Sequence, residues 1–174
     1  DFANLPDTEP DDPFAEYTGA GVIFGATGGV TEAVIRHVLG TVTAEQIASV
    51  AECGVRGLEG IKAFEVKAGD LTLKIAVANG LGNADKLIEK IESGEEFFHF
   101  VEIMACPGGC IGGGGQPSAD IAQKRIRTQG IFNADEKCTL RSVEQNTALD
   151  LVYALLRGRA HDLLHVHYPD HGHK

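Results

Sequence analysis

Two cysteines in a glycine-rich stretch are the residues of this chain best suited to metal chemistry. Cys106 and Cys110 are four residues apart within residues 102–117, so a loop or a first helical turn can bring both thiolates to one side. Thiolates are the ligands that zinc and iron-sulfur clusters require. The six glycines of this stretch let the backbone approach a bulky inorganic group. The pattern predicts a metal or cluster loop, with buried thiols or a redox pair as the alternatives.

A second glycine-rich segment, residues 19–29, precedes apolar residues at helical spacing over 30–39. A tight loop that leads into a helix N-terminus suits anions or the oxygen and nitrogen atoms of a ligand. A phosphate-binding loop is the alternative. The Gly-Lys-Ser/Thr ending of such a loop is missing here, however, and the first lysine of the chain is Lys62.

The elements that must position these two segments alternate between strand and helix. Alternating and apolar runs predict a hairpin and a later strand, and helical spacing predicts four further helices. The expected hairpin spans 61–67 and 71–78, the strand 97–104, and the helices 43–51, 84–91, 118–128 and 148–156, with Thr43 and Ser118 as caps. This order predicts an α/β fold with a small, mainly parallel sheet flanked by helices, in which the cysteine loop follows a strand.

Composition narrows the classes of protein that the chain can belong to. Its 174 residues, 43% of them hydrophobic, suffice for one ordinary domain with a core. The net charge of −10 disfavours nucleic acid and anionic membranes as partners. No membrane span and no signal peptide are expected, because no apolar run approaches the roughly 20 residues that a span needs. The default expectation is a cytoplasmic protein.

The cysteine stretch, Glu-x-Met-Ala-Cys-Pro-Gly-Gly-Cys-x-x-Gly-Gly-Gly-Gln-Pro, resembles the third cluster-binding signature of the iron-only hydrogenases. Residues 18–30 resemble the glycine-rich active-site segment upstream of it, and the resemblance extends over nearly the whole chain. It implies that residues 17–174 are the C-terminal lobe of the catalytic domain, after an extended lead-in over residues 1–16. The implied activity of the parent protein is the reversible interconversion of dihydrogen with two protons and two electrons.

The resemblance also implies a cofactor. In this family a 4Fe–4S cubane is joined through one cysteine sulfur to a diiron unit that carries carbon monoxide, cyanide and a bridging dithiolate. The matching position for the bridging sulfur is Cys110, and the matching position for a ligand of the cubane alone is Cys106. The remaining cysteines, Cys53 and Cys138, lie in segments without a glycine cradle and are not expected to be ligands.

Further site residues follow from the same resemblance. Phe24 and Gly25 are expected to line the pocket around the diiron unit, and Met104 matches the pocket methionine of the family. Core packing is the alternative for Phe24 and for Met104. Many family members have methionine where this chain has Thr31, so a pocket contact from that position is in doubt. Glu102 is a candidate for relaying protons or for a structural hydrogen bond.

Two matching cysteines leave half of a four-thiolate set missing. The expected partners are therefore the N-terminal lobe of the same catalytic domain and ferredoxin or another electron carrier, and this chain alone is expected to be inactive and without its cluster. An apolar face left by the missing lobe predicts self-association. Two other readings compete: an iron-sulfur assembly or scaffold protein, and a zinc-binding module that uses histidines such as His161 and His165.

Overall fold

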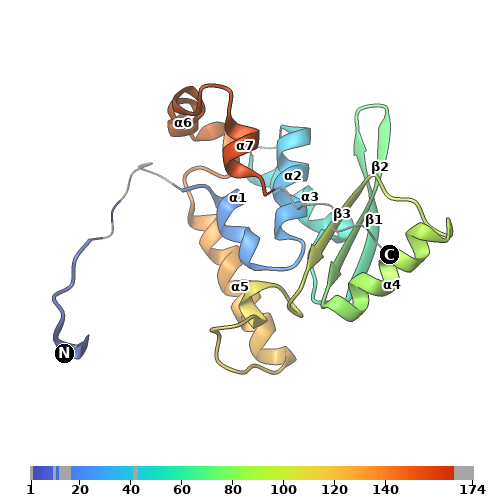
Figure 1. Ribbon diagram of the computed structural model, residues 1–174, viewed down its shortest axis with the longest axis horizontal. Coiled ribbons are helices and arrows are strands. Elements are labelled where there is room, and N and C mark those ends of the chain that lie inside the picture. The colour runs from blue at the N-terminus through green and yellow to red at the C-terminus, as the bar shows by residue number, and fades with distance from the viewer. Residues whose placement is uncertain (1, 10, 12–16, 41–42, 167–174) are drawn as a thin grey trace. The chain divides into compact units, whose positions relative to one another are not determined.

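A three-stranded sheet carries the cysteine loop at the end of its last strand (Figure 1). The computed structural model describes residues 2–9, 11, 17–40 and 43–166. These residues form two units, residues 17–145 and residues 1–16 with 146–174. The domain boundaries expected from the sequence stay a prediction. Among the described residues, no helix combines the length and apolar character needed to cross a bilayer.

The larger unit contains the sheet and most of the helices. In chain order its elements are α1 (Gly19–Val22), η2 (Ile23–Gly25), α2 (Gly29–Leu39), α3 (Ala44–Val50), the π-helical turn η3 (Ala51–Val55), β1 (Ile61–Ala68), β2 (Leu71–Asn79), α4 (Leu81–Glu92), β3 (Phe100–Met104), η4 (Cys110–Gly112), α5 (Ile121–Lys137) and η5 (Val143–Gln145). The α/β class expected from the sequence is confirmed.

The strands are ordered β1-β2-β3, with β1 and β2 antiparallel and β2 and β3 parallel. The sheet is therefore mixed rather than mainly parallel, because the hairpin contributes the longer of the two pairings. Helix α4 packs on one side, where Ala76, Ala78 and Leu87 form a small buried cluster. The opposite side packs against α2 through a second cluster that includes Ile35 and Ile75.

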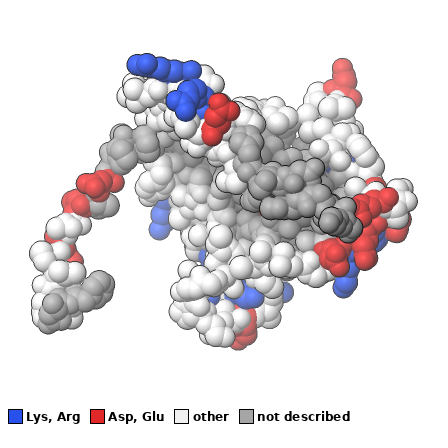
Figure 2. Space-filling model, in the orientation of Figure 1, with Lys and Arg blue, Asp and Glu red and all other residues white. Residues whose placement is uncertain are grey.

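Acidic side chains gather over α4 at the right of the molecule (Figure 2). Glu89 and Glu92 lie on the exposed face of this helix, and Glu95 and Glu96 follow it. Lys90 pairs with Glu95 at 3.1 Å. Such exposed pairs contribute little to stability. The main effect of this surface is therefore to add negative charge to the chain.

A buried ionic cluster links α2 to α5 and to the segments beside them. The Arg36 guanidinium donates to Asp135 at 2.8 and 2.9 Å and to Glu32 at 2.6 Å, and all three side chains are fully buried. Arg56 adds two bonds to Glu32, and Arg141 adds two bonds to Asp135. Burial alone would raise the pKa of Asp135, but the hydrogen bonds from the two arginines outweigh it and hold that pKa below its usual value.

The smaller unit contains η1 (Phe2–Asn4), α6 (Ala148–Leu156) and α7 (Ala160–Leu164). The expected helix over residues 148–156 is confirmed with the same bounds. Neither α6 nor α7 buries a residue, and Leu151, Tyr153 and Leu155 on α6 are more than half exposed. Part of the expected lead-in, residues 1, 10 and 12–16, lies outside the described residues.

Candidate cluster site

The cysteine loop begins directly after β3 and is shaped by its own backbone hydrogen bonds. The N–H of Gly109 donates to the carbonyl of Cys106 at 3.0 Å, and the N–H of Gly112 donates to the carbonyl of Gly109 at 3.1 Å. Cys110 opens the short helix η4 and is exposed, whereas Cys106 is half-buried. Both are free thiols. The structure therefore brings the two predicted ligands together on one accessible loop.

The glycines of the loop are needed where other backbone comes close. Gly108 and Gly109 have φ angles of 91° and 90°, a conformation that other residues rarely adopt. A Cβ atom on Gly109 would lie 2.8 Å from the backbone nitrogen of Thr27, and one on Gly113 would lie 3.2 Å from Sγ of Cys106. The first contact packs this loop against the other glycine-rich segment, and the second leaves space beside the thiol.

Basic side chains of α5 hold the far side of the loop. The ammonium of Lys124 donates to the carbonyl of Pro107 at 3.2 Å. The guanidinium of Arg127 donates to the carbonyls of Ile111 and Pro117, each at 2.9 Å. These bonds tie the loop from Pro107 to Pro117 to α5 and bring two positive charges to its backbone carbonyls.

Phe24 and Gly25 lie in η2, the short helix that precedes α2. The neighbouring Ile23 is fully buried, whereas Phe24 is 47% exposed. Core packing, the alternative considered for Phe24, therefore does not describe its position in this chain. A Cβ atom on Gly25 would lie 3.3 Å from the side chain of Ile131 on α5, so this glycine sits tightly against that helix. The pocket role expected for both residues stays a prediction.

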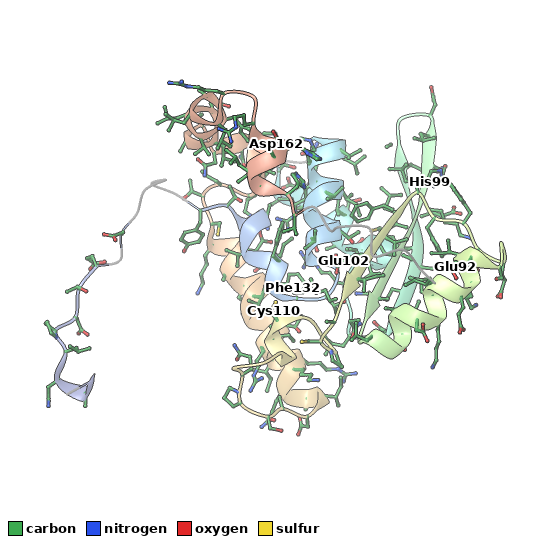
Figure 3. All side chains as sticks on the ribbon, in the orientation of Figure 1. Glu92, His99, Glu102, Cys110, Phe132 and Asp162 are labelled. Carbon is green, nitrogen blue, oxygen red and sulfur yellow. The ribbon has the colours of Figure 1, made fainter. Side chains whose placement is uncertain are left out.

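Glu102 and Met104 lie on β3 and point to the same side of the sheet, two residues apart. Figure 3 labels Glu102 among the side chains of the molecule. Its buried carboxylate accepts hydrogen bonds from the N–H of Gly28 at 2.7 Å and from both the N–H and the hydroxyl of Thr31 at 2.8 Å. Of the two roles considered for Glu102, the structure shows the structural hydrogen bond. Met104 is half-buried at the strand end, next to the cysteine loop.

Two buried side chains near the site, Lys62 and Asn79, were not singled out from the sequence. The ammonium of Lys62 donates to three backbone carbonyls, and Asn79 accepts from the N–H of Gly108 at 2.8 Å. Burial lowers the pKa of Lys62, an effect that the charge of Glu102 opposes. One signal was available: strand alternation places Lys62 on the same face as Phe64 and therefore toward the core.

The other cysteines lie in places that fit structural roles. Cys53 is half-buried in η3 beside the cluster of Ile35 and Val66, and burial raises the pKa of its thiol. Cys138, at the end of α5, donates from Sγ to the carbonyl of Ala134 at 3.3 Å. That neither cysteine is a cluster ligand stays a prediction.

The histidine alternative receives limited support. The rings of His161 and His165 stack with their centroids 4.8 Å apart. Within residues 2–9, 11, 17–40 and 43–166, no group of three or more His, Cys, Asp or Glu side chains is arranged to hold a metal ion. The last histidines of the chain, at positions 167, 171 and 173, lie outside the described residues.

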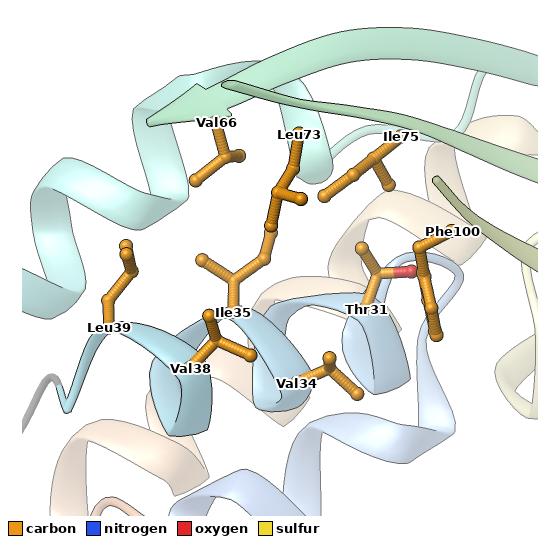
Figure 4. A pocket seen from close by; sticks show the side chains of 9 residues that line it. All are labelled: Thr31, Val34, Ile35, Val38, Leu39, Val66, Leu73, Ile75 and Phe100. Carbon is orange, nitrogen blue, oxygen red and sulfur yellow. The ribbon is translucent and has the colours of Figure 1, made fainter. Parts of the chain in front are cut away.

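A small apolar cavity lies between α2 and the sheet (Figure 4). Its volume is about 40 Å³, and its lining includes Ile35, Val38, Leu73 and Phe100. No residue of the cysteine loop lines it. The cavity is therefore separate from the candidate site and reflects incomplete packing of this helix on the sheet.

The thiolates of the loop are the kind of ligand that an iron-sulfur cluster needs, but the loop supplies only half of the required number. Cys106 and Cys110 offer two sulfur ligands in a glycine cradle, whereas a 4Fe–4S cluster is held by four thiolates. No third cysteine lies on this loop or on the glycine-rich segment. A complete site needs two ligands from elsewhere.

Comparison with known proteins gives a consistent result along the chain. A family model described as "Iron only hydrogenase large subunit, C-terminal domain" matches residues 1–114. A second model, described as "Iron hydrogenase small subunit", matches residues 120–171.

Individual relatives agree with these models. The NADP-reducing hydrogenase subunit HndD of Solidesulfovibrio fructosivorans is 45% identical over 97% of this chain and 30% of its own length. A structure of a variant of [FeFe]-hydrogenase HydA1 from Chlamydomonas reinhardtii superposes with a TM-score of 0.67 at 39% identity, covering 97% of this chain and 51% of that one. Cytosolic iron-sulfur assembly component 3 of Rattus norvegicus is 31% identical over 83% of this chain and 31% of its own length. The chain thus spans about a third of the curated relatives compared here.

Proposed function

Because this chain belongs to the family of iron-only hydrogenase large subunits, we propose that it forms part of an enzyme that interconverts protons and dihydrogen. Its contribution is the pair of thiolates of Cys106 and Cys110. The observation that carries the proposal is that both thiols lie on one accessible loop that is packed tightly against the glycine-rich segment. When bound, the cluster supplies the redox and hydrogen chemistry, and the residues of this chain bind it and shape its surroundings.

The finer roles follow the same assignment. In this proposal Cys110 would hold both the cubane and the diiron unit through its sulfur, and Cys106 would be a ligand of the cubane. Phe24, Gly25 and Met104 would line the pocket of the diiron unit, where they would limit the space for small ligands and exclude water. The exposure of Phe24 supports this assignment, because the side chain is available to face a group outside this chain.

The proposal includes partners. The two missing ligands come from the N-terminal lobe of the same catalytic domain, and ferredoxin or another electron carrier exchanges electrons with the assembled enzyme. The length of the relatives, of which this chain covers only part, supports a further lobe. Without that lobe we expect no hydrogen evolution from this chain, and the apolar side chains exposed on it favour self-association.

A second function is an iron-sulfur assembly component, because one relative carries that name. It shares the thiolates but needs no pocket around a diiron unit. The higher identity to the hydrogenase subunit favours the catalytic branch. A zinc module is the third reading, and it requires histidine or cysteine ligands beyond the two in the loop.

Anaerobic iron-sulfur reconstitution tests the ligand assignment. The chain is reconstituted with excess small thiol, which supplies the two ligands that the loop lacks, and bound iron and sulfide are counted and examined by EPR. The double variant Cys106→Ala/Cys110→Ala should lose iron. The matched control Cys53→Ala/Cys138→Ala should keep it. Equal iron in both variants, or stoichiometric zinc in place of iron, would contradict the assignment.

A further inference from the structure

One side of the sheet carries three buried polar side chains, one from each strand. Lys62 on β1, Asn79 on β2 and Glu102 on β3 are 8%, 2% and 6% exposed. In the strand register Lys62 pairs with Val77, and Val77 pairs with Glu102. Asn79 lies two residues beyond Val77, so all three polar side chains point to the same side, toward the N-terminus of α2. Polar groups in such a position need partners, because burying them unpaired is costly.

Glu102 satisfies the start of α2. The first N–H groups of a helix have no partner within it, and a negative charge there is favourable. Gly28 is the N-cap of α2 and has no side chain that could fill this role. The carboxylate of Glu102 does so instead, through the N–H groups of Gly28 and Thr31 and the hydroxyl of Thr31.

Lys62 binds backbone carbonyls near the N–H groups that Glu102 binds. Its ammonium donates to the carbonyl of Val55 at 2.7 Å, to that of Gly57 at 3.0 Å and, more weakly, to that of Thr27 at 3.4 Å. Three donors thus meet three carbonyls. The peptide group between Thr27 and Gly28 is therefore held at its carbonyl by Lys62 and at its N–H by Glu102.

Asn79 connects the sheet to the cysteine loop. Its side-chain oxygen accepts from the N–H of Gly108 at 2.8 Å, and its side-chain nitrogen donates to the carbonyl of Glu59 at 2.7 Å. The carbonyl of Gly108 in turn accepts from the N–H of Thr27 at 3.1 Å. The bonds of all three side chains therefore meet where the two glycine-rich segments touch.

We propose that Lys62, Asn79 and Glu102 are positioning residues that fix the cysteine loop against the turn at residues 26–28 before any cluster binds. The charge of Glu102 also opposes the lowering of the Lys62 pKa by burial, so removing this carboxylate takes away part of what keeps the buried ammonium charged. The use of this preorganised loop as a cluster site rests on the proposed function. The arrangement itself is a property of the chain and can be measured without metal.

Amide hydrogen exchange of the metal-free chain, followed by NMR, tests this proposal. In Glu102→Gln, Lys62→Met and Asn79→Ala, exchange at Gly28, Thr31 and Gly108 should rise by about tenfold or more, because buried groups lose their partners. Amides of the β1–β2 ladder should change by less than about twofold, because local opening does not require global unfolding. The matched controls, Glu65→Gln and Lys67→Met, change exposed residues of β1 and should change neither set.

Thiol reactivity gives a second measurement. Alkylation of the half-buried Cys106 should speed up in the three variants and stay unchanged in the controls. If a single variant does not fold, the double variant Lys62→Met/Glu102→Gln tests the same idea, because it removes both buried charges at once. It should raise exchange at the loop and speed alkylation of Cys106 while the β1–β2 ladder stays protected. A uniform rise in exchange across the sheet, or no rise at the loop, would overturn the positioning role.

The outcomes separate this inference from the proposed function. If the exchange pattern appears as expected but iron uptake does not depend on Cys106 and Cys110, the positioning role stands and the ligand assignment is wrong. If iron uptake depends on both cysteines while loop exchange is unchanged by the variants, the ligand assignment stands and the positioning role is wrong.

Discussion

Replacing Gly109 with alanine tests the close approach of the two glycine-rich segments. Gly109 has a φ angle of 90°, and a Cβ atom there would lie 2.8 Å from the nitrogen of Thr27 and 3.0 Å from the carbonyl oxygen of Gly25. Both neighbours are backbone atoms, so neither can turn away as a flexible side chain would. Alanine at this position must therefore change its own conformation or push the segments apart.

The cost of Gly109→Ala has two parts. Gly109 has φ 90° and ψ −160°, a region that is essentially restricted to glycine, and holding an alanine there costs about 1–3 kcal/mol. Forcing an extra carbon into packed structure costs about 1–3 kcal/mol more. Together they lower the free energy of unfolding by roughly 2–6 kcal/mol. For a chain of this size, roughly 2–4 °C is lost per kcal/mol, so Tm should fall by about 4 °C or more.

Two other glycines of the same loop separate the two parts. Gly115 has a φ angle of 85° with nothing near its Cβ position, so Gly115→Ala should cost only the strain of a positive φ, about 1–3 kcal/mol. Gly114 has open space and no positive φ, so Gly114→Ala should be neutral or stabilising by up to about 1 kcal/mol. Urea unfolding followed by circular dichroism measures all three. If Gly109→Ala cost no more than Gly115→Ala, the packing of the two segments inferred here would be refuted.

Two further predictions concern buried polar groups. The lowered pKa of Asp135 contributes stability that is present above the ordinary value of 3.8 and is lost as pH falls through the folded-state pKa. In urea unfolding, Asp135→Asn should therefore be less stable than the unchanged chain at pH 7, with the gap shrinking below pH 3.8; a gap that persisted there would show that the charge is not the cause. Thr31→Val should lower stability by about 1.5–3 kcal/mol, because it removes a hydrogen bond to the Glu102 carboxylate. Thr31→Ser keeps that bond, and equal losses in the two variants would contradict this reasoning.

Local patterns in the sequence were sufficient for most helices and for the hairpin. Thr43 does cap α3, as part of a capping box with Gln46, and the hairpin lies where alternation placed it. The predicted start of α5 was wrong. Ser118 was expected to cap this helix, but the structure caps it with Asp120, whose side chain and that of Gln123 form a capping box. Ser118 and Asp120 are both residue types that cap helices. The two hydrogen bonds exchanged between Asp120 and Gln123 decide in favour of Asp120.

Strand pairing depends on contacts that are distant in sequence and was less accessible. The apolar run from Phe97 predicted a strand of eight residues, but β3 begins only at Phe100. His99 exchanges hydrogen bonds with Lys74 through its ring and its backbone N–H, and Phe97 packs against the ring of His99. Aromatic residues favour strands, yet the partner strand determines where the ladder ends.

The supporting residues of the site show most clearly what one sequence leaves open. Alternation alone places Lys62 among core-facing residues, and the same reasoning applies to Glu102. A buried charge requires a partner, so the sequence predicts that each of these residues makes a polar contact but does not identify the partner. The sequence does not show that Lys62 and Glu102 flank the same residue. That follows only from the strand order β1-β2-β3, in which Val77 of β2 pairs with Lys62 on one side and with Glu102 on the other. The cysteine motif identifies what the loop can bind, whereas the order of the strands determines what holds the loop in place.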